Sequence, residues 1–148
     1  MEMKSDPTNG SSVTNPDGPM KLIPGQNVTV TIEAKPFNNL TNVWFESGAV
    51  YDLKATGTWF DAGRPSGPNG YPDGNFLQNL ASWLRRLPDR NWFILLGVAE
   101  PKNTPFVIGT NAIYQAQQSG QLICFANDVP GFYWNNTGAL RLTIARVR

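Results

Sequence analysis

Residues 121–146, QLICFANDVPGFYWNNTGALRLTIAR, contain two apolar-rich segments joined by a polar loop. The first segment, 121–126, is almost continuously apolar, and the second, 140–144, alternates apolar and polar residues with period two. This alternation is typical of a half-buried strand. The stretch 127–138 between them contains Asn, Asp, Pro and Gly, the residues that turns favour. The sequence therefore predicts two strands joined by a long polar loop.

The same patterns recur upstream of this loop. Residues 27–33 and 50–56 alternate apolar and polar side chains. Residues 92–98 are continuously apolar, as expected for a central strand covered on both faces, and 106–108 form a further short apolar run. Several short strands separated by turn residues predict an all-β fold, an antiparallel β-sandwich of the jelly-roll type.

One helix is predicted within this sandwich, inserted around 76–87. It follows 61–74, which are rich in Gly and Pro and read as one long loop. Asn75 or Asp73 is positioned to cap the helix, and Pro88 to end it. The apolar residues of this segment fall on one helical face: Phe76, Leu80, Trp83, Leu84 and Leu87.

Length and charge bound the organisation of the chain. Of its 148 residues, 1–20 are polar and read as a disordered arm or linker, and 21–148 form one domain. The net charge of +1 gives no field for nucleic acid, and Arg85, Arg86 and Arg90 read as a solvated helix face. No apolar run is long enough to span a bilayer, so no membrane insertion is expected.

The absence of histidine excludes whole classes of site. No Ser-His-Asp triad, Cys-His pair or His-ligated metal site can be built. The single cysteine, Cys124, lies in an apolar strand and is expected to be a buried thiol. A bound metal would therefore be a hard cation held by oxygen, such as Ca²⁺ or Mg²⁺.

The loop 127–138 holds the densest group of potential oxygen ligands. It offers the carboxylate of Asp128, the amides of Asn127, Asn135 and Asn136, and several backbone carbonyls. Ca²⁺ takes six to eight such oxygens, and a site with few carboxylates leaves positions that vicinal sugar hydroxyls can fill. A tight turn in which Asn and Asp bond their own backbone explains the same composition, and composition alone favours that turn.

The order of these residues adds a more specific signal. The string 127–138, NDVPGFYWNNTG, resembles the closing loop of the PA-IL-type (LecA-like) calcium-dependent galactose-binding lectins of bacteria. Weaker, collinear likeness extends through 55–59, 67–74 and 92–97, so that the resemblance covers about 21–148. It implies a galactose-binding-like jelly roll that holds a hexose through Ca²⁺.

The resemblance also implies roles for individual residues. Calcium would be held by the side chains of Asp128, Asn135 and Asn136, by the carbonyl of Phe132, and by a carbonyl near Asp61. The residues implied to contact the carbohydrate are Asp128, Asn135, Val129, Phe132, Tyr71 and Asp73.

Two positions depart from the pattern of this family. Tyr71 stands where the family has histidine, and Gly74 where it has glutamine. We expect Tyr71 to stack on a sugar face and to hydrogen-bond through its hydroxyl. The helix around 76–87 is also longer than the family's connection at this place.

The resulting hypothesis is a calcium-dependent lectin module for a galactoside or related glycan, without enzymatic activity. A protein-interaction or structural module on the same fold is the main alternative. A glycosidase is the other, and would use two of the acids in or near loops: Asp61, Asp73, Glu100, Asp128 and Glu46. The sequence leaves homo-oligomerisation open. Calcium availability favours an extracellular, periplasmic or cell-surface location.

Overall fold

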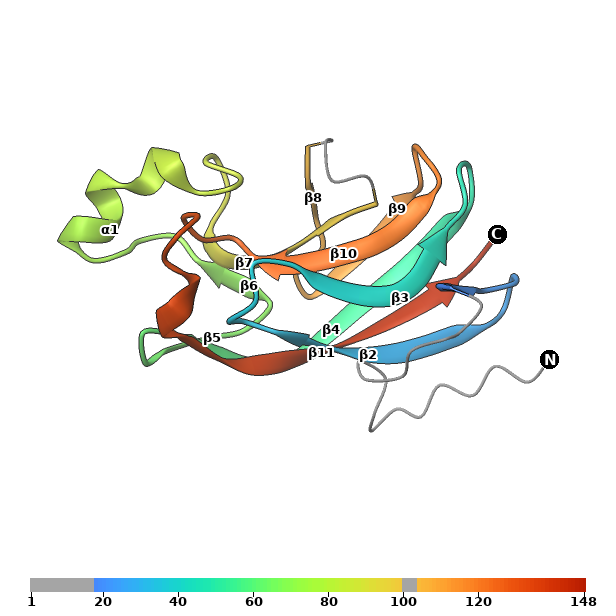
Figure 1. Cartoon of the computed structure of the whole chain (residues 1–148), viewed down its shortest axis with the longest axis horizontal. Helices are drawn as coiled ribbons and strands as arrows, with labels where there is room; N and C mark the ends of the chain where they lie inside the picture. Colours follow the sequence, from blue (N-terminus) through green and yellow to red (C-terminus); the bar gives the residue numbers. More distant parts are fainter. Residues whose placement is uncertain (1–17, 100–103) are drawn as a thin grey trace.

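The computed structural model describes residues 18–99 and 104–148 as two β-sheets packed face to face (Figure 1). The predicted all-β sandwich is confirmed. Most of the arm expected over 1–20 lies outside the described residues, but Met20 already belongs to the first strand. No helix in the described part of the chain is long and apolar enough to cross a membrane.

The first sheet contains the strands that lead to the loop 127–135. Its pairs are antiparallel, except that β1 runs parallel to β3. β8 (Phe106–Val107) pairs with β7 beside the main path. Along that path the order is β1 (Met20–Lys21), β3 (Asn39–Phe45), β10 (Gly120–Ala126), β7 (Trp92–Val98) and β6 (Asn69–Tyr71).

The second sheet is organised around the C-terminal strand. β11 (Asn136–Arg146) lies between β2 (Asn27–Glu33) and β4 (Val50–Asp61) and is antiparallel to both. β5 (Arg64–Ser66) and β9 (Asn111–Gln115) both pair with β4. The first residue of β11 therefore lies opposite the last residue of β4, at the end of the sandwich that carries the pocket.

The core lies between the sheets and follows the predicted alternation. In β2, Val28, Val30 and Ile32 are buried while the residues between them are more exposed. Every residue of β7 is buried, which confirms the predicted central strand. Phe93 and Leu95 face the main core, whereas the other side of β7 joins a smaller cluster that includes Phe125.

The segment 61–74 is not one loop, as the sequence suggested. It contains β5 and β6, which extend the two sheets around the pocket. A periodicity pattern cannot identify strands this short, because three residues do not establish a period of two. Their pairing with β4 and β7 decides their conformation.

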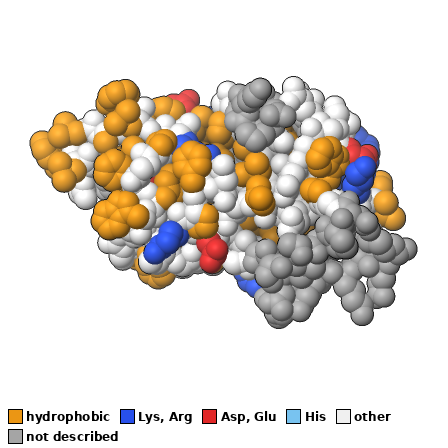
Figure 2. Space-filling view, viewed as in Figure 1, with side chains coloured by type: hydrophobic (Ala, Val, Ile, Leu, Met, Phe, Trp, Pro, Cys, Tyr) orange, Lys and Arg blue, Asp and Glu red, His pale blue; other side chains and the backbone are white. Residues whose placement is uncertain are grey.

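The helix expected around 76–87 is shorter than that range, and most residues of its apolar face are exposed, whereas Leu87 packs against the smaller core cluster. α1 (Phe76–Leu80) ends after five residues and is followed by the 3₁₀ turn η1 (Ser82–Leu84). Phe76 is 76% exposed and Trp83 is 70% exposed. Figure 2 shows hydrophobic side chains gathered at the end of the molecule where α1 projects in Figure 1. Helical periodicity is present, but within 18–99 and 104–148 no other element buries these side chains.

Arg86 does not lie on a solvated helix face. Its guanidinium lies over the Phe125 ring at 3.3 Å and over the Phe37 ring at 3.7 Å. It also donates to the Phe37 carbonyl, and to Asn38 Oδ1 at 2.7 Å. This arginine therefore attaches the segment after η1 to the outer face of the first sheet. The prediction of a buried thiol at Cys124 is confirmed, and burial raises its pKa.

Candidate functional site

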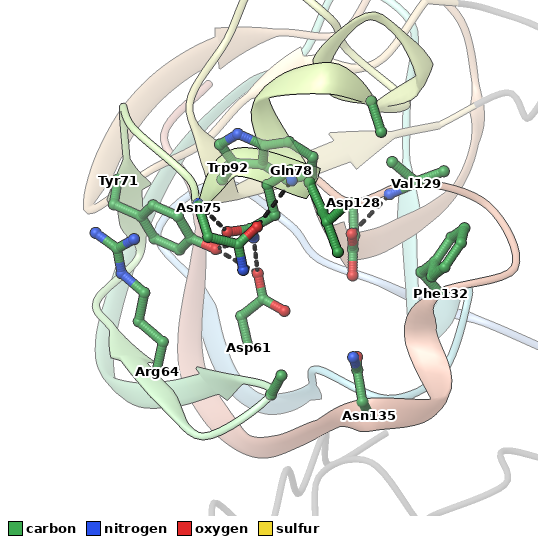
Figure 3. A pocket seen from close by; sticks show the side chains of 13 residues that line it. Asp61, Arg64, Tyr71, Asn75, Gln78, Trp92, Asp128, Val129, Phe132 and Asn135 are labelled. Atoms are coloured by element: carbon green, nitrogen blue, oxygen red, sulfur yellow. Dashed lines mark hydrogen bonds between the residues drawn. The ribbon is translucent and has the colours of Figure 1, made fainter.

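A pocket of about 590 Å³ opens at one end of the sandwich, between α1 and the loop 127–135 (Figure 3). Its walls come from the ends of β4, β6 and β7, from α1 and from that loop. The lining residues are Asp61, Ala62, Arg64, Tyr71, Asn75, Leu77, Gln78, Ala81, Trp92, Asp128, Val129, Phe132 and Asn135. The pocket therefore brings together segments that are far apart in the sequence.

Three polar side chains point into this pocket and form what we call the polar floor: Asp61, Asp128 and Asn135 (Figure 3). Asp61 is the last residue of β4, and strand pairing places it opposite Asn136 at the start of β11. Asp128 follows β10 by two residues. The antiparallel pairing of β11 with β4 thus sets the loop's ligand candidates beside a carboxylate that is distant in the sequence.

The Asp128 carboxylate is buried, with 4% of its surface exposed. Its Oδ2 accepts a hydrogen bond from Asn136 Nδ2 at 3.0 Å, and its Oδ1 accepts one from the Val129 backbone N–H at 2.7 Å. Burial, together with the smaller effect of the like charge of Asp61, raises the pKa of Asp128 to about 6 despite these two bonds. The polar floor therefore holds a destabilised negative charge.

This pKa shift predicts how stability depends on pH without metal. Because the folded pKa exceeds the unfolded value, stability is highest when Asp128 is protonated and is lost as pH rises through about 6. Between pH 7.5 and 5, wild type should gain about 1–2 kcal/mol relative to Asp128→Asn. Chemical denaturation of both proteins in calcium-depleted buffer measures the difference. A difference that does not change with pH would contradict the shift.

Two amide oxygens next to Asp128 lack any hydrogen-bond partner. Asn135 Oδ1 and Asn136 Oδ1 are both buried and unpaired, although Asn136 Nδ2 is fully engaged with Asp128 and Ala34. Buried polar atoms without a partner are uncommon and indicate a missing ligand, ion or water. Carboxylate and amide oxygens are the donors that Ca²⁺ accepts, so Asp61, Asp128, Asn135 and Asn136 fit a hard cation.

The fit depends on amide and carbonyl oxygens as well as on acids. Within residues 18–99 and 104–148, no group of three or more His, Cys, Asp or Glu residues could hold a metal ion. Asn127, the remaining amide of the loop, serves another purpose. It donates to the Leu87 carbonyl and accepts from the Leu87 N–H, both at 2.9 Å, and so anchors the segment that follows η1.

Asp61 is held from the other side by the hydroxyl of Tyr71 and the amide of Gln78. Tyr71 Oη donates to Asp61 Oδ2, and Gln78 Nε2 donates to the same oxygen at 2.9 Å. Gln78 Nε2 also donates to Tyr71 Oη at 2.7 Å. Burial raises the pKa of Tyr71, and the bond to Asp61 raises it further, so the hydroxyl stays protonated. These bonds leave Asp61 Oδ1 for a ligand.

The predicted stacking role of Tyr71 does not match its surroundings. The ring is only 6% exposed, and the Arg64 guanidinium covers it at 3.6 Å from the ring centroid. A sugar could stack there only after Arg64 moved. Asp73 is exposed and outside the pocket lining, and its carbonyl accepts a bond from Arg64 at 2.9 Å. Asp73 thus contacts Arg64 rather than the pocket.

Gln78 and Asn75 belong to the pocket but were not among the predicted site residues. They form a capping box, in which Gln78 N donates to Asn75 Oδ1 at 2.9 Å and Asn75 N donates to Gln78 Oε1 at 2.8 Å. The position of Gln78 also favours glycine at residue 74, because a Cβ on Gly74 would lie 2.4 Å from Gln78 Cβ. The Asn-x-x-Gln spacing signals the cap. Nothing local in the sequence shows that this amide reaches Asp61.

Of the acids considered for a glycosidase, Asp61 and Asp128 line the pocket. Asp73 is exposed and is not part of the lining. Glu46 forms an ion pair with Arg146 at 3.3 Å, and Glu100 lies outside the described residues.

The two sheets and their pocket define an all-β sandwich protein. The structure is similar to a solved structure described as the N-terminal domain of EclA, a PllA-like lectin, with a TM-score of 0.61 and 17% sequence identity. The likeness covers 80% of this chain and 94% of that domain. No protein-family model and no curated protein sequence matches the chain. At this identity the likeness establishes the fold alone.

Proposed function

We propose that this protein is a carbohydrate-binding module, and that a calcium ion on the polar floor holds vicinal hydroxyls of a galactose-like hexose. The observation that carries the proposal is the pair of buried, unpaired oxygens on Asn135 and Asn136 beside the charged Asp128. A cation there would satisfy both oxygens and offset the repulsion between Asp61 and Asp128. A lectin domain with the same fold supports carbohydrate as the ligand.

A bound calcium ion would coordinate the sugar hydroxyls, and the protein's own polar groups would orient the sugar. Asp61 Oδ1 and the Asn135 side chain line the pocket, where they can exchange hydrogen bonds with hydroxyls. Phe132 gives the pocket an aromatic edge, the kind of surface on which sugar C–H groups pack. None of these roles requires a bond to be broken, so we propose binding without catalysis.

A thermal-shift titration tests this function. After chelation, calcium should raise the melting temperature by roughly 5–10 °C at a hundredfold excess over its Kd, since such binding adds about 2.7 kcal/mol. Galactose or another hexose should add a further rise only with calcium present. Magnesium is the control, because its smaller octahedral shell fits this amide-rich set less well. No response to calcium would contradict the proposal and favour a protein-interaction module.

A further inference from the structure

The loop 127–135 is attached to the segment that follows η1 by contacts outside the pocket. Two consecutive residues of that segment bond two consecutive residues of the loop. The Arg86 N–H donates to the Asp128 carbonyl at 3.1 Å, and the Leu87 N–H donates to Asn127 Oδ1 at 2.9 Å. Neither Arg86 nor Leu87 lines the pocket. The side chain of Asp128 therefore belongs to the polar floor, while its carbonyl is bound to a residue outside the lining.

The Arg86 guanidinium is enclosed by three aromatic rings. It lies 3.3 Å from the ring centroid of Phe125, 3.7 Å from that of Phe37 and 5.8 Å from that of Tyr133. Phe37 and Tyr133 also contact each other edge to face, with their centroids 5.5 Å apart. Burial lowers the pKa of Arg86, as expected for a guanidinium removed from water. Cation–ring contacts are stronger when desolvated, so this enclosure fixes the position of Arg86.

The same guanidinium reaches the other end of the loop. Arg86 Nη1 donates to the Tyr133 hydroxyl at 3.5 Å, and Nη2 donates to Asn38 Oδ1 at 2.7 Å. Tyr133 donates its own hydroxyl hydrogen to the Ala126 carbonyl, which closes the loop between residues 126 and 133. Burial raises the pKa of Tyr133 to about 12, so the hydroxyl keeps its hydrogen. Arg86 thus contacts the loop at both ends, at Asp128 by its backbone and at Tyr133 by its side chain.

The metal-free loop needs a restraint of this kind. Burial and the like charge of Asp61 disfavour the ionised Asp128, and Asn135 Oδ1 has no hydrogen-bond partner. Both features favour a rearrangement that would return these oxygens to water. A rearranged ligand set must be reassembled when a metal binds, which costs affinity. Contacts outside the ligand shell prevent this, and the loss of one typically costs about ten- to hundredfold in metal affinity.

We propose that Arg86 is a positioning residue for the calcium site: it holds the loop 127–135 so that Asp128 and Asn135 keep the spacing that a cation requires. The inference rests on the proposed function, because calcium affinity is the property that this positioning sets. Arg86 acts through Tyr133 and through the Asp128 carbonyl, without lining the pocket itself. The planar guanidinium is required, because it can lie flat on aromatic rings while it donates in several fixed directions, and an ammonium group cannot.

Calorimetric calcium titration of two variants at position 86 tests the proposal. Arg86→Met removes the charge and the donors, whereas Arg86→Lys keeps the charge but not the planar fork. Each should raise the calcium Kd by about tenfold. The direction of the change is informative, because the loss of a positive charge near a cation site would by itself lower the Kd. Arg86→Lys, the milder change, decides the test if Arg86→Met does not fold.

Arg85→Met is the matched control for these variants. It removes the same charge from the preceding residue, whose guanidinium bonds the carbonyls of Ser82 and Pro88 and lies over the Trp92 ring. The calcium Kd of this variant should stay within about twofold of wild type, since a charge outside the site has a small, screened effect.

Nitrogen-15 relaxation of the metal-free proteins measures the positioning without calcium. The amide order parameters of residues 129–135 should fall in both Arg86 variants and keep their wild-type values in Arg85→Met. If Arg86 only stabilised the fold, the folded variants would keep the wild-type order parameters and the wild-type calcium Kd. That result would overturn the proposal.

The remaining outcomes separate this inference from the proposed function. If the folded Arg86 variants bind calcium as wild type does, the positioning role is wrong while the calcium site stands. A lower Kd in Arg86→Met would leave Arg86 only an electrostatic effect and would also overturn the inference. An equal loss of affinity in Arg85→Met would assign the effect to the whole segment rather than to Arg86. If wild type does not bind calcium, the proposed function fails and the inference fails with it.

Discussion

Replacing Asp128 with Asn should raise the Kd for calcium by at least roughly a hundredfold, about 2.7 kcal/mol. The change removes one of the two carboxylates of the polar floor and keeps the volume of the side chain. Metal-free Asp128→Asn should be at least as stable as wild type at pH 7.5, because burial and the charge of Asp61 both disfavour the ionised carboxylate. Calcium titration followed by calorimetry and by melting temperature measures both effects.

Asp73→Asn is the matched control for this prediction. It makes the same chemical change and removes the same charge, but Asp73 is exposed and outside the pocket lining. Calcium should bind this variant as it binds wild type. Equal calcium affinity in Asp128→Asn and Asp73→Asn would show that the polar floor does not hold the ion. A large loss of stability in metal-free Asp128→Asn would contradict the buried-charge argument separately.

Gly70→Ala should destabilise the fold by more than about 4 kcal/mol, a loss that only severe core or backbone conflicts reach. A Cβ at Gly70 would lie 2.0 Å from the Trp92 carbonyl oxygen and 2.5 Å from the Ile94 nitrogen. Both atoms belong to the backbone of β7, which cannot yield as a flexible side chain can. Gly70 also has φ +67°, where other residues are strained. Denaturant unfolding of the purified variant measures the loss.

Gly63→Ala is the control that measures the effect of a positive φ angle without a steric clash. Gly63 also has positive φ, at +88°, but nothing lies within 4 Å of its Cβ position. Its substitution should cost about 1 kcal/mol, the price of the backbone conformation alone. Comparable losses in both variants would show that β6 can move away from β7. In that case Tyr71, which follows Gly70 in β6 and pairs with Trp92 of β7, would not be rigidly placed beside Asp61.

Much of the sandwich could be predicted from local patterns. The alternation at 27–33 corresponds to β2, and the apolar run at 92–98 corresponds to β7, with the same bounds in both cases. Both predictions succeed because burial on one face of a sheet requires alternating apolar residues, and burial on both faces requires a continuous apolar run. The short helix predicted around 76–87 is also present, although it is regular only over Phe76–Leu80. Periodicity reports a potential apolar face, but Leu80 and Trp83 are exposed among the described residues.

The residues of the candidate site could also be predicted only in part. The loop string 127–138 identified Asp128, Asn135 and Asn136, whose proximity follows from a short connection between two strands. Asp61 was assigned to this group only through the resemblance, and the register of β11 on β4 is what places it opposite Asn136. Gln78 could not be found, because its contact with Asp61 depends on how α1 is anchored.

By itself the sequence determined the sandwich and its central strand, and it identified the candidate oxygen ligands of the loop 127–138, since each depends on residues that are close together in the chain. The tertiary structure alone decided that Tyr71 is covered by Arg64, that Gln78 bonds Asp61, and that Leu77 borders the same cavity as Asp128. These contacts join residues of different strands and loops. Only the packing of the two sheets and of α1 sets the distances between them.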